Sequence, residues 1–266
     1  MSNFAIPGVV VTGTTPKEPP LLLVISREKC GKSTLATTLF NWPNQGDEPL
    51  VLAADATGPD SCSKFGCQVQ HIKIKDCPPL GFAAKFTYCT NLVEKYVQSG
   101  ASKPGSIMID CMSTLAERIM SDDARFSKNP DPRSHYSAAL DCIRNNLNRL
   151  IDLGIPVIML SWLKEGGTFE NTLASGQKVK RTVLGGPAIL GQALRALVAG
   201  KAHMILMLDK VKIGHGEPGA DQDGYVRQFH TRTYDSIEAG GRYTLPEPSP
   251  AHLGWCLDVI MGRRQL

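Results

Sequence analysis

The sequence has no long uninterrupted hydrophobic run and few cysteines. No stretch of its 266 residues reaches the roughly 18 uncharged apolar residues of a membrane-spanning helix. The first twenty residues lack the basic start and continuous apolar segment of a signal peptide. Eight cysteines are far fewer than the roughly 8–10% of a disulfide scaffold, which favours a reducing compartment. We therefore expect a soluble, cytoplasmic protein with no membrane partner.

The sequence also lacks internal repeats, low-complexity tracts and a strong excess of either charge. The 29 Lys and Arg residues against 25 Asp and Glu give a net charge of +4. This mildly basic balance permits a nucleic-acid partner without indicating one. The apolar share of 42% and the charged share of 20% are typical of globular proteins and exclude collagen-like and wholly disordered chains.

Short apolar segments that read as strands alternate with amphipathic helices along most of the chain. We expect strands at 21–25, 50–55, 69–74, 107–110, 155–162, 203–208 and 225–233, and helices at 32–40, 82–98, 136–153, 188–198 and 251–261. This order predicts an α/β fold with a mainly parallel sheet sandwiched by helices. Turn signals at 166–167 and 175–176 predict a hairpin over 164–186, among antiparallel additions at one edge of the sheet.

Two further segments have distinctive compositions. Residues 1–19 are rich in Pro, Gly and Thr and are interpreted as a tail or an edge strand, and residues 20–266 as a single domain. Residues 121–134, SDDARFSKNPDPRS, are polar and contain prolines, which predicts a loop.

The segment SREKCGKST, residues 26–34, is the most informative part of the chain. It matches the phosphate-binding P-loop pattern G-x-x-x-x-G-K-[ST] at Gly31, Lys32 and Ser33, while Ser26 stands where the first glycine is expected. The segment follows a buried strand and opens a helix, as this chemistry requires. The alternative is an ordinary basic turn between a strand and a helix.

The chemistry of the segment points to ATP and Mg²⁺. Backbone N–H groups and the start of a helix attract the phosphates, Lys32 supplies a point charge, and Ser33 offers a hydroxyl to Mg²⁺. The expected nucleotide-contacting residues are Ser26, Arg27, Glu28, Lys29, Cys30, Gly31, Lys32, Ser33 and Thr34.

Acidic residues at strand ends are candidates for the other half of the site. Asp110 follows the strand 107–109 and is expected to hold the hydration shell of Mg²⁺. Asp55 and Asp60 are candidates to orient the attacking water, or turn formers. Ser113 and Thr114 add polar contacts or cap the next helix.

These motifs, in this order, resemble those of RecA-like P-loop ATPases. The segments SREKCGKSTLA, SIMIDCMSTL and PVIMLSW, with Asp55 at a strand end, carry the resemblance. More narrowly, residues 20–262 resemble the short bacteriophage AAA-type ATPases that consist of a RecA core, some of which anneal single strands in phage recombination. The resemblance implies a Mg²⁺-dependent ATPase in the host-cell cytoplasm, with Lys32 and Asp110 in the catalytic roles.

The sequence departs from that family at two positions. Thr57 stands where RecA-like proteins place a water-activating glutamate, so the resemblance implies weak hydrolysis or another acid. Ser161 is the nearest match to the polar sensor at the end of the strand after Asp110, where the family has glutamine or asparagine.

The resemblance also implies partners, namely single-stranded DNA and further copies of the chain in a ring or filament. Loops after the central strands bind DNA in RecA-like folds, and the matching segment 164–186 includes Phe169 as a possible stacking face. Its basic residues would neutralise phosphates; they are Lys164, Lys178, Lys180 and Arg181. A solvated charged hairpin is the alternative. Three later arginines are candidates to act on a neighbour's γ-phosphate, or are surface charges: Arg227, Arg232 and Arg242.

Two other functions share the phosphate loop and stay open. A small-molecule kinase should carry an Arg-rich lid, whereas residues 121–134 contain only two arginines. A ParA-like assembly module carries a second lysine where this chain has Arg27.

The cysteines raise two separate questions of chemistry. Cys62, Cys67, His71 and Cys77 have zinc-ligand types at a spacing that is not a familiar zinc pattern. Cys30 lies near a helix start, which predicts a reactive thiol.

Overall fold

The computed structural model describes residues 19–264 except 41, 44–47, 56–59, 64–66, 68, 101–102, 127–130, 173–177, 184, 190, 218–220, 222, 234–236 and 238. The expected tail, apart from its last residue, and the position of Thr57 therefore lie outside the described residues. None of the described helices has the length and apolar character needed to cross a bilayer.

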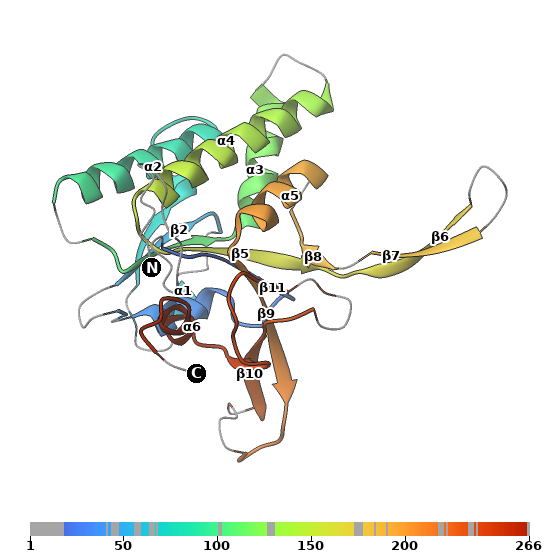
Figure 1. Ribbon diagram of the computed structural model, residues 1–266. Helices are drawn as coiled ribbons and strands as arrows, with labels where there is room; N and C mark the ends of the chain where they lie inside the picture. The colour runs from blue at the N-terminus through green and yellow to red at the C-terminus, as the bar shows by residue number, and fades with distance from the viewer. Residues whose placement is uncertain are drawn as a thin grey trace, which may run out of the picture.

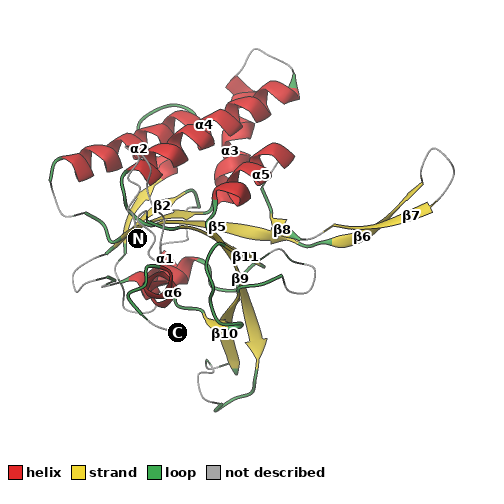
Figure 2. Cartoon of the chain, viewed as in Figure 1, coloured by secondary structure: helices red, strands yellow, loops and turns green. Residues whose placement is uncertain are grey.

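A mainly parallel sheet forms the middle of the molecule (Figures 1 and 2). Its strand order is β12-β10-β9-β1-β5-β4-β2-β3, with β11 paired to β9 and β8 to β5. The strands from β9 to β3 are parallel, and β10 pairs antiparallel with β9. This topology confirms the predicted fold class. The strands of the sheet are β1 (Leu21–Ser26), β2 (Pro49–Ala53), β3 (Gln70–Lys73), β4 (Ser106–Asp110), β5 (Val157–Lys164), β8 (Gly186–Pro187), β9 (Met204–Lys212), β10 (Tyr225–His230), β11 (Gly240–Gly241) and β12 (Ser249–Pro250).

Helices cover both faces of the sheet because its central strands are apolar on both sides. Along β1, Leu21, Leu23 and Ile25 belong to one buried cluster, while Leu22 and Val24 belong to the other, as the alternation of side chains in a strand requires. Four helices pack on the first face: α2 (Phe82–Gln98), α3 (Met112–Phe126), α4 (Pro132–Asp152) and α5 (Gln192–Lys201). The second face is covered by η1 (Ser33–Leu39), α1 (Asp60–Ser63) and α6 (Leu253–Ile260), while η2 (Ile74–Asp76) precedes α2.

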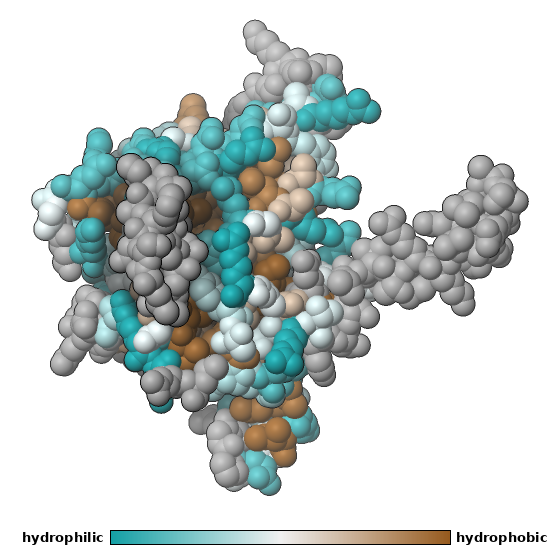
Figure 3. All heavy atoms as spheres, viewed as in Figure 1, coloured by the Kyte–Doolittle hydropathy of each residue, from teal (hydrophilic) through white to brown (hydrophobic). Residues whose placement is uncertain are grey.

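The surface view agrees with this layering. Figure 3 shows hydrophilic residues over the outer side of the layer that contains α2 and α4. Hydrophobic residues gather over the end of the β9–β10 ribbon, where Ile213 is exposed.

The predicted hairpin is present as a separate two-stranded ribbon. Strands β6 (Gly167–Thr172) and β7 (Lys178–Val183) pair antiparallel. Figure 1 shows the ribbon continuing from β5 and extending away from the layered body.

The prediction of a loop over residues 121–134 is wrong at 121–126 and 132–134, which are helical, while residues 127–130 lie outside the described residues. Helix α3 continues to Phe126, and α4 begins at Pro132, four residues before the predicted start. The polar residues of α3 make contacts with its neighbours: Asp122 accepts a hydrogen bond from the N–H of Phe82 at the start of α2, and Asp123 pairs with His135. Asp131 caps α4 by accepting from the N–H of Arg133.

The helix after the phosphate loop lies at the predicted place but is a 3-10 helix over Ser33–Leu39. Three threonine hydroxyls donate to carbonyls three residues earlier, from Thr34 to Gly31, from Thr37 to Thr34 and from Thr38 to Leu35. These bonds take carbonyls that an α-helix would use for its own backbone. Helix α2 has the predicted bounds, and other predicted elements are present with shifted ends; α5, for example, starts at Gln192 instead of 188.

Candidate functional site

The phosphate loop joins the end of β1 to the start of η1. Its backbone has positive φ at Lys29 (59°) and Gly31 (94°), and such turns present successive N–H groups to an anion. A Cβ built on Gly31 would lie 3.0 Å from Nε of Arg227 and 3.0 Å from Oγ1 of Thr34. Glycine at position 31 therefore satisfies both the backbone conformation and the close approach of Arg227.

The ammonium group of Lys32 lies folded against the start of the loop. Its Nζ donates to the carbonyls of Ser26 (3.3 Å) and Arg27 (3.1 Å) and to Oγ of Ser26 (3.0 Å). Only 9% of Lys32 is exposed. Burial lowers the pKa of Lys32, and the neighbouring thiols and carboxylates oppose this shift.

Ser33 and Asp110 lie close together although they are far apart in sequence: Ser33 begins η1, after β1, and Asp110 is the last residue of β4. The side chain of Ser33 acts on the carboxylate of Asp110, at the end of β4, and works to lower its pKa. Burial outweighs this effect and raises the pKa of Asp110; the nearby charge of Asp55 adds to the rise, while Lys32 opposes it. A buried carboxylate beside a second carboxylate favours the presence of a cation.

Asp55 lies beside Asp110, at the end of the adjacent strand. The N–H groups of Ala54 and Asp55 both donate to the carbonyl of Asp110, at 2.6 and 3.2 Å. The carboxylate of Asp55 accepts from Oγ1 of Thr114 (3.3 Å) and from the thiol of Cys111 (3.8 Å). Burial raises the pKa of Cys111 to about 11, so this thiol is a donor near neutral pH.

The other predicted acid lies elsewhere. Asp60 is exposed in α1, and Lys73 is 3.5 Å from its carboxylate. Of the two predicted acids, Asp55 is therefore the one whose charge acts on Asp110.

The predicted sensor serine lies inside its strand instead of at the end. Ser161 is buried in β5, which continues to Lys164, and its hydroxyl is 2.9 Å from that of Ser113. Ser113 also accepts from the N–H of Trp162. Ser113 and Thr114 thus link the start of α3 to β5 and to Asp55.

Arg227, on β10, lies on the phosphate loop of its own chain. Its Nε donates to the carbonyl of Cys30 at 3.2 Å, and its Nη1 is 3.3 Å from the carboxylate of Asp221. The sequence suggested Arg227 either as a residue acting on a neighbouring copy or as a surface charge. Arg232 and Arg242 are exposed, and their backbone N–H groups donate to Glu247 and to the carbonyl of His203.

These residues fit a nucleotide and Mg²⁺ chemically. The loop offers N–H groups and Lys32 for phosphates, and Ser33 and Asp110 offer the oxygen ligands that Mg²⁺ prefers. One carboxylate and one hydroxyl suffice for Mg²⁺, which retains several waters. Among the described residues, no three His, Cys, Asp or Glu side chains gather as a metal cluster.

The cysteines proposed for zinc have separate surroundings. The thiol of Cys62 donates to the carbonyl of Ser33, and that of Cys77 lies 3.3 Å from that of Cys89. Cys30 is buried with 9% exposed, so its reactivity stays a prediction.

The base of the hairpin is connected to the phosphate loop. Nε of Arg27 lies 2.8 Å from the carboxylate of Glu165, and both side chains are more than half exposed. Lys164 is exposed at the end of β5. In the ribbon, Lys178, Lys180 and Arg181 pair in register with Thr172, Glu170 and Phe169 respectively.

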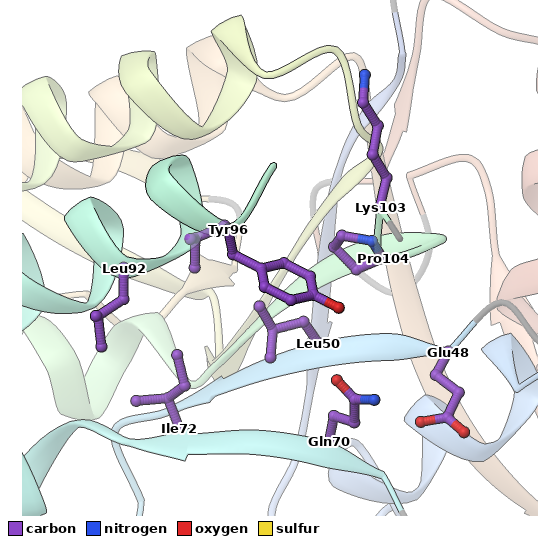
Figure 4. Close-up of a pocket in the computed structure, with 9 residues that line it drawn as sticks. Glu48, Leu50, Gln70, Ile72, Leu92, Tyr96, Lys103 and Pro104 are labelled. Atoms are coloured by element: carbon purple, nitrogen blue, oxygen red, sulfur yellow. The ribbon is translucent and has the colours of Figure 1, made fainter. Parts of the chain in front are cut away.

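A cavity of about 440 Å³ lies at the opposite end of the strands. Figure 4 shows Leu50 and Ile72 from the sheet facing Leu92 and Tyr96 of α2. Because it lies at the starts of β2 and β3, this cavity is remote from the phosphate loop.

Comparisons with known proteins give only distant likenesses, and these are to solved structures. No family model matches the chain, and no curated protein matches it. The crystal structure of the KaiC-like protein PH0186 from the hyperthermophilic archaeon Pyrococcus horikoshii OT3 is similar over 87% of this chain and 85% of that one, with 12% identity and a TM-score of 0.46. The assignment of the fold class therefore rests on the sheet order and not on this likeness.

Proposed function

We propose that this chain is a RecA-like P-loop protein that binds ATP with Mg²⁺ and hydrolyses it. The observation that carries the proposal is the placement of Asp110, at the end of β4, beside Ser33 and Lys32 of the phosphate loop. Ser33 opens the helix after the loop, and both Ser33 and Lys32 act to lower the pKa of Asp110. This is the pairing of hydroxyl and carboxylate that a Mg²⁺ site beside a triphosphate needs.

Each residue has a defined part in this proposal. The loop N–H groups and Lys32 bind the phosphates, and Ser33 and Asp110 hold Mg²⁺. When bound, Mg²⁺ supplies positive charge that offsets the charge developing on the γ-phosphoryl group. Asp55, held by Thr114 and Cys111, orients the attacking water in place of the glutamate found in RecA-like proteins.

The test is nucleotide binding by calorimetry with ATP and Mg²⁺, comparing the wild type with Lys32→Ala and with Lys95→Ala. Lys95 is an exposed residue of α2 and serves as the matched control. We expect Lys32→Ala to weaken binding at least tenfold, since it removes a charged partner worth about 1.5–3 kcal/mol. No heat with the wild type, or equal affinities for wild type and Lys32→Ala, would refute the proposal.

We further propose that the ATP-bound protein acts on single-stranded DNA in phage-type recombination or annealing, as a homo-oligomeric ring or filament. The support is the place of the hairpin: its base contacts the phosphate loop through Arg27 and Glu165, so the nucleotide state can influence the ribbon. Lys178, Lys180 and Arg181 lie in β7 of this ribbon.

A triple substitution of Lys178, Lys180 and Arg181 by serine tests the DNA contact. Each lost phosphate contact reduces the salt dependence of single-strand binding by about 0.7, so three reduce the slope of log K against log salt by about 2. The matched control replaces three exposed basic residues of the body, Lys95, Lys103 and Arg133. An unchanged slope in the hairpin variant would remove this role.

Two alternative functions are separated by simple assays. The segment expected as a kinase lid is partly the end of α3, and a screen of phosphoryl acceptors decides that case. Size-exclusion chromatography with and without ATP separates a ParA-like dimer switch from a larger ring or filament.

A further inference from the structure

Ser26 occupies the position of the first glycine in the P-loop pattern and is fully buried at the end of β1. Its hydroxyl donates to the carbonyl of Arg27 at 2.8 Å and accepts from Nζ of Lys32 at 3.0 Å. A hydroxyl has one proton and two lone pairs, so both bonds can exist together. Glycine at this position would provide the carbonyl but not the hydroxyl.

All three protons of the Lys32 ammonium group have an acceptor within this part of the loop. The acceptors are the carbonyls of Ser26 and Arg27 and the hydroxyl of Ser26, at 3.3, 3.1 and 3.0 Å. An ammonium group has three donors, so none is left for a phosphate oxygen. The shortest of the three bonds is the one that depends on serine.

We propose that the hydroxyl of Ser26 competes with a nucleotide phosphate oxygen for one of the three N–H donors of Lys32. This competition weakens nucleotide binding. Ser26 is thus a positioning residue that acts through Lys32. This inference rests on the proposed ATP-binding function and adds what sets the affinity of the site. Phosphate must displace the hydroxyl before Lys32 can bind it, so the cost falls on ATP and ADP alike.

Two variants separate the hydroxyl from the side-chain volume. Ser26→Ala removes only the hydroxyl, whereas Ser26→Gly also removes Cβ and restores the common P-loop residue. We expect both to bind ATP and ADP roughly 10- to 100-fold more tightly than the wild type, the range that one hydrogen bond to a charged group contributes. The gain in binding free energy applies equally to bound ATP and to the transition state of its hydrolysis. KM for ATP should therefore fall while kcat changes little.

Thr37→Ala is the matched control. It removes a hydroxyl from η1 that donates to the carbonyl of Thr34 and makes no bond to Lys32. We expect it to leave both affinities unchanged. Circular dichroism and thermal unfolding of each variant show whether it is folded before its affinity is compared.

The outcomes distinguish this inference from the proposed function. If the wild type binds ATP and both Ser26 variants bind it equally or more weakly, the competition by Ser26 is overturned while the ATP site stands. Tighter binding by Ser26→Gly alone would also overturn it, because Cβ and not the hydroxyl would then be responsible. If no variant and no wild type binds nucleotide, the proposed function and this inference fall together.

Discussion

The Nε atom of Arg227 lies 3.2 Å from the carbonyl oxygen of Cys30, so a residue near the end of the chain rests on the phosphate loop. Asp221 holds the guanidinium group from the other side at 3.3 Å. Hydrogen bonds from the N–H groups of Tyr225 and Asp223 lower the pKa of Asp221, with help from Lys210 and Arg227. Asp221 is therefore ionised near neutral pH and keeps Arg227 in place beside Gly31.

This contact predicts that Arg227 serves the nucleotide site of its own chain. Arg227→Ala should weaken ATP and ADP binding by a similar factor, roughly 10- to 100-fold, the range for a lost charged hydrogen bond. Mixing Arg227→Ala with Lys32→Ala protein decides between own and neighbouring chain. A site built within one chain gives no recovery of ATPase activity on mixing, whereas recovery would show that Arg227 acts on a neighbour.

Gly31→Ala should abolish nucleotide binding. Alanine at this position would have positive φ, which costs about 1–2 kcal/mol. Its Cβ would also lie only 3.0 Å from Nε of Arg227 and from Oγ1 of Thr34. Gly81→Ala is the matched control, since Gly81 has φ of +80° and open space around its Cβ position. Urea unfolding and calorimetry should show similar backbone costs in the two variants but loss of binding in Gly31→Ala alone.

Asp55→Asn should reduce ATP hydrolysis about 10²–10⁴-fold, the usual contribution of a positioned acid or base. Nucleotide affinity should stay within a few-fold, because Asp55 contacts Thr114 and Cys111 and not the phosphate loop. Single-turnover hydrolysis is the measurement, and Asp60→Asn is the control, as Asp60 is exposed and paired with Lys73. Equal loss in both variants would contradict the assignment of Asp55.

Glu247→Gln should destabilise the protein in a pH-dependent way. Burial acts to raise the pKa of Glu247, but hydrogen bonds from Thr231 and His230 outweigh it, so the pKa is lowered. A carboxylate whose pKa is lower in the folded than in the unfolded protein stabilises the fold at pH values above its unfolded pKa, near 4.3. This stabilisation is lost as the pH falls through the folded pKa.

The variant should therefore be less stable by about 1.5–3 kcal/mol at pH 7, and this difference should shrink below about pH 4.3. Urea unfolding at several pH values measures it, with exposed Glu117→Gln as the control. A difference between wild type and Glu247→Gln that stays constant down to pH 3 would contradict this account.

Elements with a strong local pattern were predictable from the sequence. Helix α2 has the predicted bounds, Phe82–Gln98, because apolar residues at helical spacing and the following glycine define both its face and its end. The end of α3 was not predictable, because Asp122 and Asp123 are stabilised by Phe82 and His135, which belong to the neighbouring helices α2 and α4. Local polarity alone favours a loop there.

The sequence by itself determined the alternation of strands and helices and the place of the loop over residues 26–34 between a strand and a helix, because periodicity and the Gly31-Lys32-Ser33 spacing are local properties of the chain. Only the tertiary structure decided that Asp55 rather than Asp60 lies beside Asp110 and that Arg227 contacts its own loop. It also decided that the hydroxyl oxygen of Ser26 accepts a hydrogen bond from Lys32. These relationships join residues through the order of strands in the sheet, and strand order depends on packing across the whole molecule.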